Sequence, residues 1–183
     1  MSPDEIQTLV VLFQKAWKED KQIFLFANGG STANASPITT DLSKGSSDKL
    51  GKRFRVLSLN SNPKWMTATG NDYSFEDVFV RQLANYAKPG NIVFTMSVSG
   101  NSPNLVKAID WSNQNGLTSV ALLGKNRGKL AELAHHVLVI DDTHYGRAED
   151  AHMTIGHILC YAFMEQTEAR PGRNESLSCE RQG

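Results

Sequence analysis

Two short polar loops, each expected to end a strand and begin a helix, carry residues suited to chemistry. Residues 28–31 read Asn-Gly-Gly-Ser (the glycine loop), and residues 97–103 read Ser-Val-Ser-Gly-Asn-Ser-Pro (the serine loop). Glycine lets the backbone approach a ligand, and serine hydroxyls bind an anion together with the free amides of a helix N-terminus. Either loop alone fits an ordinary turn in which a serine, such as Ser31, caps the helix. Two such loops on neighbouring strands favour a phosphorylated small molecule.

The glycine loop matches no nucleotide-binding motif, because no lysine follows the glycines and the G-x-G-x-x-G spacing is absent.

The last part of the chain carries a carboxylate and two histidines at helical spacing. Glu149 and His152 are three residues apart and share one side of a helix. His157 follows Glu149 by two turns, about 80° around the helix axis. An imidazole with acidic neighbours can donate and accept protons near neutral pH. His157 is therefore a candidate acid–base group, and a place in the core is the alternative.

Other polar residues have weaker signals. Asn71 and Asp72 could cap a following helix or bind sugar hydroxyls, and their spacing does not separate the two. Residues 135–136 are histidines that precede an edge strand and look structural. Cys160 lies in an apolar helix and is predicted to be in the core. With Cys179 as the other cysteine, the chain has too few for a disulfide framework.

The elements that position these residues follow from the apolar pattern. Runs rich in Val, Ile, Leu and Phe show little alternation, as in strands buried on both faces of a parallel sheet, at residues 22–27, 53–59, 91–97, 117–123 and 136–140. Helical stretches alternate with them, at residues 4–18, 75–87, 103–115 and 146–167. This alternation predicts an α/β three-layer sandwich with right-handed crossovers. Ligands of such a sheet bind beyond the carboxyl ends of its strands.

The composition excludes several classes of protein. The 183 residues include 19 Lys plus Arg and 19 Asp plus Glu, a net charge of zero that disfavours nucleic-acid binding. The apolar runs are far shorter than the roughly 20 residues of a membrane span, and acids stand where a signal peptide has lysines. We expect a soluble cytoplasmic protein with one domain at residues 1–167. The polar residues 168–183 are expected to form a disordered or loosely attached tail.

Together the motifs resemble the sugar isomerase (SIS) domain. They are the two loops, the Gly-Asn-Asp segment at 70–72, the Gly-Lys-Leu-Ala-Glu-Leu-Ala stretch at 128–134, and the last helix. Within that family they look most like the phosphoheptose isomerases. The resemblance implies a flavodoxin-like sheet with strand order 2-1-3-4-5, a homo-oligomer (tetramer or dimer) with active sites at subunit interfaces, and an aldose–ketose isomerase that works through an enediol. It also implies that the substrate contacts Asn28, Gly29, Gly30, Ser31, Asn71, Asp72, Ser97, Ser99, Ser102 and Glu149.

The resemblance also assigns the proton transfers. His157 matches the family's catalytic histidine, and Asp41 stands where the isomerases carry a catalytic glutamate. Pro37 replaces a histidine of the same helix. Some isomerases bind zinc at these positions, and the ligands that this chain keeps are Asp41, Glu149 and His157. We expect Asp41 to act as the base and His157 as the acid, with a solvated helix position as the alternative for Asp41.

Sedoheptulose 7-phosphate is the expected substrate and glycero-manno-heptose 7-phosphate the expected product. One alternative keeps the fold without the reaction, as a phosphosugar-binding regulator or a protein-binding adaptor. A second alternative is an SIS reaction on a hexosamine phosphate, which the segments at 70–76 and 151–159 disfavour.

Overall fold

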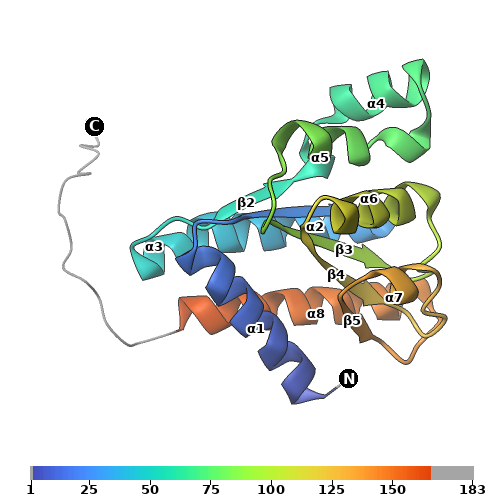
Figure 1. Ribbon diagram of the computed structural model, residues 1–183. Coiled ribbons are helices and arrows are strands. Elements are labelled where there is room, and N and C mark those ends of the chain that lie inside the picture. Colours follow the sequence, from blue (N-terminus) through green and yellow to red (C-terminus); the bar gives the residue numbers. More distant parts are fainter. Residues whose placement is uncertain (1, 166–183) are drawn as a thin grey trace, which may run out of the picture.

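Five parallel strands form one sheet in the order β2-β1-β3-β4-β5 in the computed structural model, which describes residues 2–165 (Figure 1). The strands are β1 (Gln22–Ala27), β2 (Arg55–Ser58), β3 (Ile92–Ser97), β4 (Thr118–Leu123) and β5 (His136–Val139). The α/β class, the parallel pairing and the strand order predicted from the sequence are confirmed. The expected tail at residues 168–183 lies outside the described residues.

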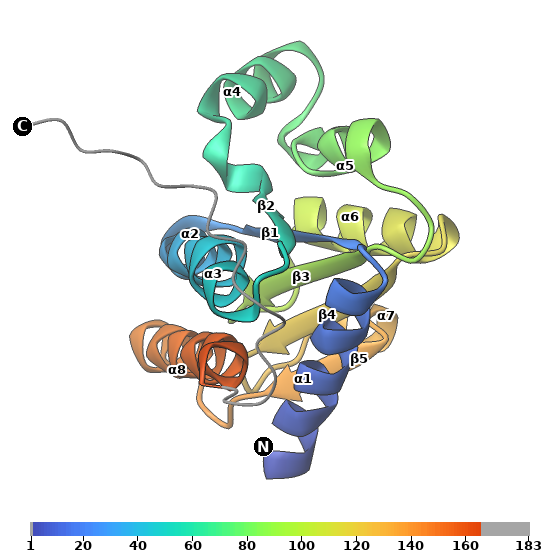
Figure 2. The same cartoon turned by 90° about the vertical axis from the view of Figure 1, so that its left-hand side faces the viewer.

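Helices cover both faces of the sheet, so that there are two hydrophobic cores (Figures 1 and 2). The first face is covered by α1 (Pro3–Lys18), α2 (Thr32–Thr40), a π-helical segment η2 (Asp41–Ser46), α3 (Ser47–Leu50) and α8 (Tyr145–Met164). The second face is covered by α5 (Val80–Tyr86), α6 (Pro103–Gln114) and α7 (Leu130–Leu133).

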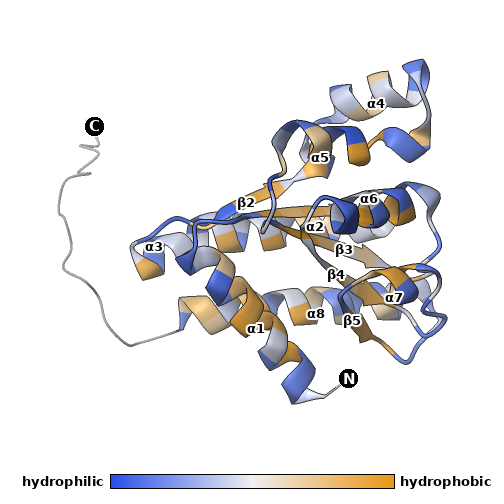
Figure 3. Ribbon diagram, viewed as in Figure 1, coloured by the Kyte–Doolittle hydropathy of each residue, from blue (hydrophilic) through white to orange (hydrophobic). Residues whose placement is uncertain are grey.

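Side chains of β1 alternate between these two cores. Ile23 and Leu25 belong to the core under α1 and α8, whereas Phe24 and Phe26 belong to the core under α5 and α6. All four are fully buried. Since both faces are covered, the inner strands β1, β3 and β4 are buried along nearly their whole length and are mostly apolar (Figure 3), whereas the edge strand β2 begins with the exposed Arg55.

The carboxyl ends of β1 and β3 lie side by side. The two strands pair from Ile23 and Ile92 to Ala27 and Met96, one residue before the glycine and serine loops begin. The chain runs from β1 to β2 on one side and continues through β3 on the other, so this edge is the switch point of the sheet. The two loops therefore lie on adjacent strands, as predicted.

The longest helix that was not expected from the sequence is α4 (Pro63–Asp72). Pro63 opens this helix, and the Asn62 side chain accepts a hydrogen bond from the backbone N–H of Trp65. Asn71 and Asp72 are the last two residues of this helix, and Ser74 is the N-cap of the next one, so the alternative that Asn71 or Asp72 caps a following helix was wrong. The expected helix at 75–87 is divided into a 3₁₀ turn, η4 (Phe75–Asp77), and α5. Figure 2 shows α4 standing away from the sheet, beyond α5.

No helix within residues 2–165 is long and apolar enough to cross a membrane.

Candidate functional site

A pocket of about 320 Å³ lies between the glycine loop, the serine loop and the start of α8. Eight of the predicted substrate-binding residues line it, namely Asn28, Gly29, Gly30, Ser31, Ser97, Ser99, Ser102 and Glu149. The structure thus brings together side chains from positions that are more than 100 residues apart in the chain.

The glycine loop is a 3₁₀ turn, η1 (Gly29–Ser31), that leads directly into α2. The Ser31 side chain makes no capping hydrogen bond, so its predicted capping role was wrong. Its hydroxyl donates instead to Glu149 Oε1 at 3.0 Å, which joins the loop to α8. A Cβ at Gly30 would lie 2.6 Å from Glu149 Oε2, so glycine is needed for the carboxylate to sit this close to the loop.

The serine loop folds around its own hydroxyl groups. Ser97 Oγ accepts a hydrogen bond from the backbone N–H of Gly100 at 3.0 Å, and Ser99 Oγ accepts from that of Asn101 at 3.4 Å. The two hydroxyls are 3.4 Å apart. Either hydroxyl can donate to the other, which leaves the proton of the accepting hydroxyl available to a ligand. The loop therefore presents neutral donors to a ligand, which suits a phosphate.

Charge in the pocket is confined to one group. Glu149 is half-buried, and no lysine or arginine is among the residues that line the pocket. An anionic ligand would be held by hydroxyl and amide donors at the start of η1 and α6. The carboxylate would accept hydrogen bonds from hydroxyl groups of the same ligand.

The structure places Asn71 and Asp72 elsewhere. Both are exposed at the end of α4, and Asn71 Nδ2 donates to Asp72 Oδ1 at 2.9 Å. Asp72 lines a different pocket of about 360 Å³, where the Arg81 guanidinium lies 3.5 Å from the centre of the Tyr73 ring.

Asp41 and His157 also lie outside the lining of the first pocket. Asp41 is half-buried at the start of η2, and His157 is exposed on α8, which packs against η2. Burial and, to a smaller extent, the charge of Asp41 raise the pKa of the Cys160 thiol to about 12. Cys160 is fully buried one turn after His157, as expected of a core cysteine.

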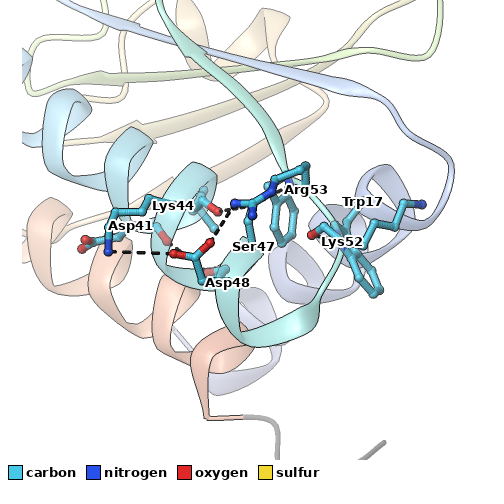
Figure 4. A network of polar contacts seen from close by, with 10 residues as sticks. Trp17, Asp41, Lys44, Ser47, Asp48, Lys52 and Arg53 are labelled. Carbon is cyan, nitrogen blue, oxygen red and sulfur yellow. Dashed lines mark hydrogen bonds and ion pairs between the residues drawn. The ribbon is translucent and has the colours of Figure 1, made fainter. Parts of the chain in front are cut away.

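Ion pairs flank Asp41. Figure 4 shows it beside Lys44, whose ammonium lies 3.9 Å from the Asp48 carboxylate, and Asp48 in turn pairs with Arg53 at 2.7 Å. These groups are exposed, so the pairs add little to stability.

The residues do not fit a metal site within one chain. Among the described residues, no group of three or more His, Cys, Asp or Glu side chains is arranged to hold a metal ion. Asp41, Glu149 and His157 are therefore not assembled within one chain as the predicted zinc ligands.

Several residues of the pocket were not expected from the sequence. Met96 and Val98 give it an apolar wall, and Tyr145 lines it from the first residue of α8. The pocket lining does not include His152, which is fully buried in α8; burial lowers the pKa of its imidazole. Apolar and aromatic residues of this kind look like core positions in a sequence and carry no separate signal.

Comparisons with known proteins agree with the fold. The profile of the SIS domain matches residues 2–124. The chain is 33% identical over 156 residues to the phosphoheptose isomerase of Aquifex aeolicus, across 85% of this chain and 81% of that relative. It is 35% identical over 155 residues to the phosphoheptose isomerase of a Nitratiruptor species, across 85% and 82% of the two chains.

A solved structure of the phosphoheptose isomerase from Neisseria gonorrhoeae superimposes with a TM-score of 0.82 at 24% identity, covering 89% of this chain and 86% of that one. This similarity shows that the two chains share a fold.

Proposed function

The chain belongs to the SIS domain family, and we propose that it is an aldose–ketose isomerase that converts sedoheptulose 7-phosphate to glycero-manno-heptose 7-phosphate. One observation carries the proposal: the glycine and serine loops enclose a pocket of neutral donors with a single carboxylate, Glu149. Such a pocket suits a ligand that has a phosphate at one end and several hydroxyl groups. The curated relatives named phosphoheptose isomerase support the same substrate.

The reaction needs two proton transfers. A base removes the proton from the carbon next to the carbonyl, and an acid protonates the carbonyl oxygen, which gives an enediol. The proton then returns to the former carbonyl carbon while the neighbouring hydroxyl loses its own. We assign the base to Asp41 and the acid to His157, as the resemblance implies.

We further propose that the protein is a homo-oligomer whose active sites lie between subunits. Asp41 and His157 do not line the pocket of their own chain, so a second copy would have to bring them to it. Ile158 and Tyr161, next to His157 on α8, are 45% and 49% exposed. The exposure of these two apolar side chains beside His157 supports a surface that another subunit covers.

The decisive experiment follows proton exchange. The protein is incubated with sedoheptulose 7-phosphate in deuterated solvent, and deuterium at the carbon next to the carbonyl is measured by NMR. We expect incorporation together with aldose formation. Because the resemblance implies that some isomerases of this kind bind zinc, the assay is run with and without added zinc. No incorporation under either condition would reject the isomerase function for this substrate.

A phosphosugar-binding regulator is the second candidate. It is favoured by the position of Asp41 and His157 outside the pocket. A regulator would bind sedoheptulose 7-phosphate in a calorimeter and exchange no proton, whereas the isomerase would do both.

A further inference from the structure

Two buried or half-buried asparagines hold the glycine loop from opposite sides. On one side is Asn104, at the start of α6, which is 2% exposed. Its Nδ2 donates to Asn28 Oδ1 at 2.9 Å, and Asn28 Nδ2 donates to Asn104 Oδ1 at 2.7 Å. The two carboxamides thus form a closed pair that joins the glycine loop to the first turn after the serine loop.

On the other side, Asn60 follows β2 and contacts the residue just before the loop. Its Oδ1 accepts from the backbone N–H of Ala27 at 3.0 Å, and its Nδ2 donates to the Ala27 carbonyl at 2.9 Å. The side chain therefore satisfies both backbone groups of the last residue of β1, beyond the point where the pairing of β1 with β2 ends at Leu25 and Ser58.

We propose that Asn104 and Asn60 are positioning residues, which fix the glycine loop at the separation from the serine loop that the ligand requires. Neither residue lines the pocket, so each would act on the ligand through the glycine loop. Both act through residues 27 and 28, which lead directly into Gly29 and Gly30. Because Gly29 has a φ of +53° and the loop contains two glycines, the segment has little stiffness of its own.

A local role for Asn104 does not account for its contacts. Its Oδ1 also accepts from the backbone N–H of Leu105 at 3.0 Å, a bond within the first turn of α6. That bond uses only the oxygen. The nitrogen is committed to Asn28, 76 residues earlier in the chain. Losing the hydrogen bond from Asn104 Nδ2 to Asn28 would leave the first turn of α6 intact and release the glycine loop.

Asn104→Asp separates these two roles. Aspartate keeps the oxygen that accepts from Leu105 and Asn28, loses the donor to Asn28 Oδ1, and sets an oxygen against that carbonyl. Asn113→Asp is the matched control. Asn113 lies on the same helix, and its Nδ2 donates to the Leu133 carbonyl and its Oδ1 accepts from Ser119, both at 2.7 Å, away from the pocket.

The first readout is hydrogen–deuterium exchange of the unliganded protein, followed by mass spectrometry. We expect faster uptake in peptides that cover residues 28–34 in Asn104→Asp and in Asn60→Asp, and wild-type uptake there in Asn113→Asp. Unchanged uptake in the first two variants would overturn the proposal, as would equal acceleration in the control, since that would indicate general destabilisation.

The second readout rests on the proposed function. Displacement of a binding group by about 1 Å can lower a rate by about a hundredfold. We expect kcat/KM for sedoheptulose 7-phosphate to fall at least about tenfold in Asn104→Asp and to stay near wild type in Asn113→Asp. A wild-type protein without turnover would reject the proposed function and leave the exchange measurement to decide the positioning role.

A double-mutant cycle provides the check on the pair itself. Asn28→Ala and Asn104→Ala should each lower kcat/KM, and the double variant should lose less than the two single losses combined, because the residues interact. Fully additive losses would show that Asn104 does not act through Asn28.

Discussion

Gly100 of the serine loop and Gly128 of the loop after β4 are in backbone contact. A Cβ at Gly128 would lie 2.5 Å from the carbonyl carbon of Gly100, and a Cβ at Gly100 would lie 2.0 Å from the Arg127 carbonyl oxygen. The backbone N–H of Leu130 donates to the Gly100 carbonyl at 3.0 Å. The loop after β4 therefore packs against the serine loop and fixes the orientation of the serine hydroxyl groups.

Gly128→Ala is expected to destabilise the protein. The added methyl group meets backbone atoms that cannot rotate away, and such overpacking costs about 1–3 kcal/mol. The φ of +60° adds strain, which the control Gly51→Ala isolates, since Gly51 has a φ of +71° and nothing within 4 Å of its Cβ position. Denaturant unfolding should show the larger loss for Gly128→Ala. Equal losses of unfolding free energy in the two variants would mean that the contact between the two loops does not contribute to stability.

Gly30→Ala should impair binding with little effect on stability. The Cβ would lie 2.6 Å from Glu149 Oε2, the end of a flexible side chain, so the carboxylate can move aside into the pocket. We expect the free energy of unfolding to change by less than about 1 kcal/mol. The dissociation constant for sedoheptulose 7-phosphate should rise at least about tenfold, which is about 1.4 kcal/mol. Wild-type affinity would contradict the placement of Glu149 beside the ligand.

An ion pair at the start of α8 makes part of the stability pH-dependent. Asp142 accepts from Arg147 Nε at 2.5 Å and from Nη2 at 3.0 Å, and these bonds are the main cause that lowers the Asp142 pKa from 3.8 to about 2. Because the folded-state pKa is depressed, the contribution is complete above about pH 4 and disappears as the pH falls through 2.

Arg147→Gln should therefore lower the melting temperature at pH 7, and the difference from wild type should shrink between pH 4 and pH 2. Lys125→Gln, which breaks the exposed pair between Lys125 and Asp141 at 3.0 Å, is the control and should change stability less at every pH. If the melting temperature of Arg147→Gln differed from that of the wild type by the same amount at every pH, the result would count against the pairing of Arg147 with Asp142.

The fold could be predicted from the sequence because its signals are local. The strand containing Phe24 and the helix opened by Pro103 are each marked by neighbouring residues. The two loops could be paired because parallel strands end at one edge. The helix at Pro63–Asp72 was missed since its apolar face is short, with Thr69 as its only buried residue. The Asn28–Asn104 pair was missed because two asparagines far apart in the chain give no pattern.

The proposed proton-transfer groups and the pocket lie in different parts of one chain. The pocket residues belong to η1, the serine loop and α8, whereas Asp41 and His157 lie outside the pocket lining of the same chain. If the active site lies between subunits, one copy with a damaged pocket and another with a damaged proton-transfer group can together form one intact site.

Subunit complementation tests this arrangement. Glu149→Gln and His157→Ala should each be inactive alone, for loss of a pocket carboxylate and of the proposed acid. Co-expressed, they should regain activity, up to about a quarter of wild type for a two-fold dimer, because a mixed pair holds one intact site. The control is Glu149→Gln with Ser97→Ala, two residues of the same pocket, which should stay inactive because Ser97 and Glu149 come from one chain. An inactive first mixture, in a sample shown to contain mixed oligomers, would mean that His157 acts within its own chain or not at all.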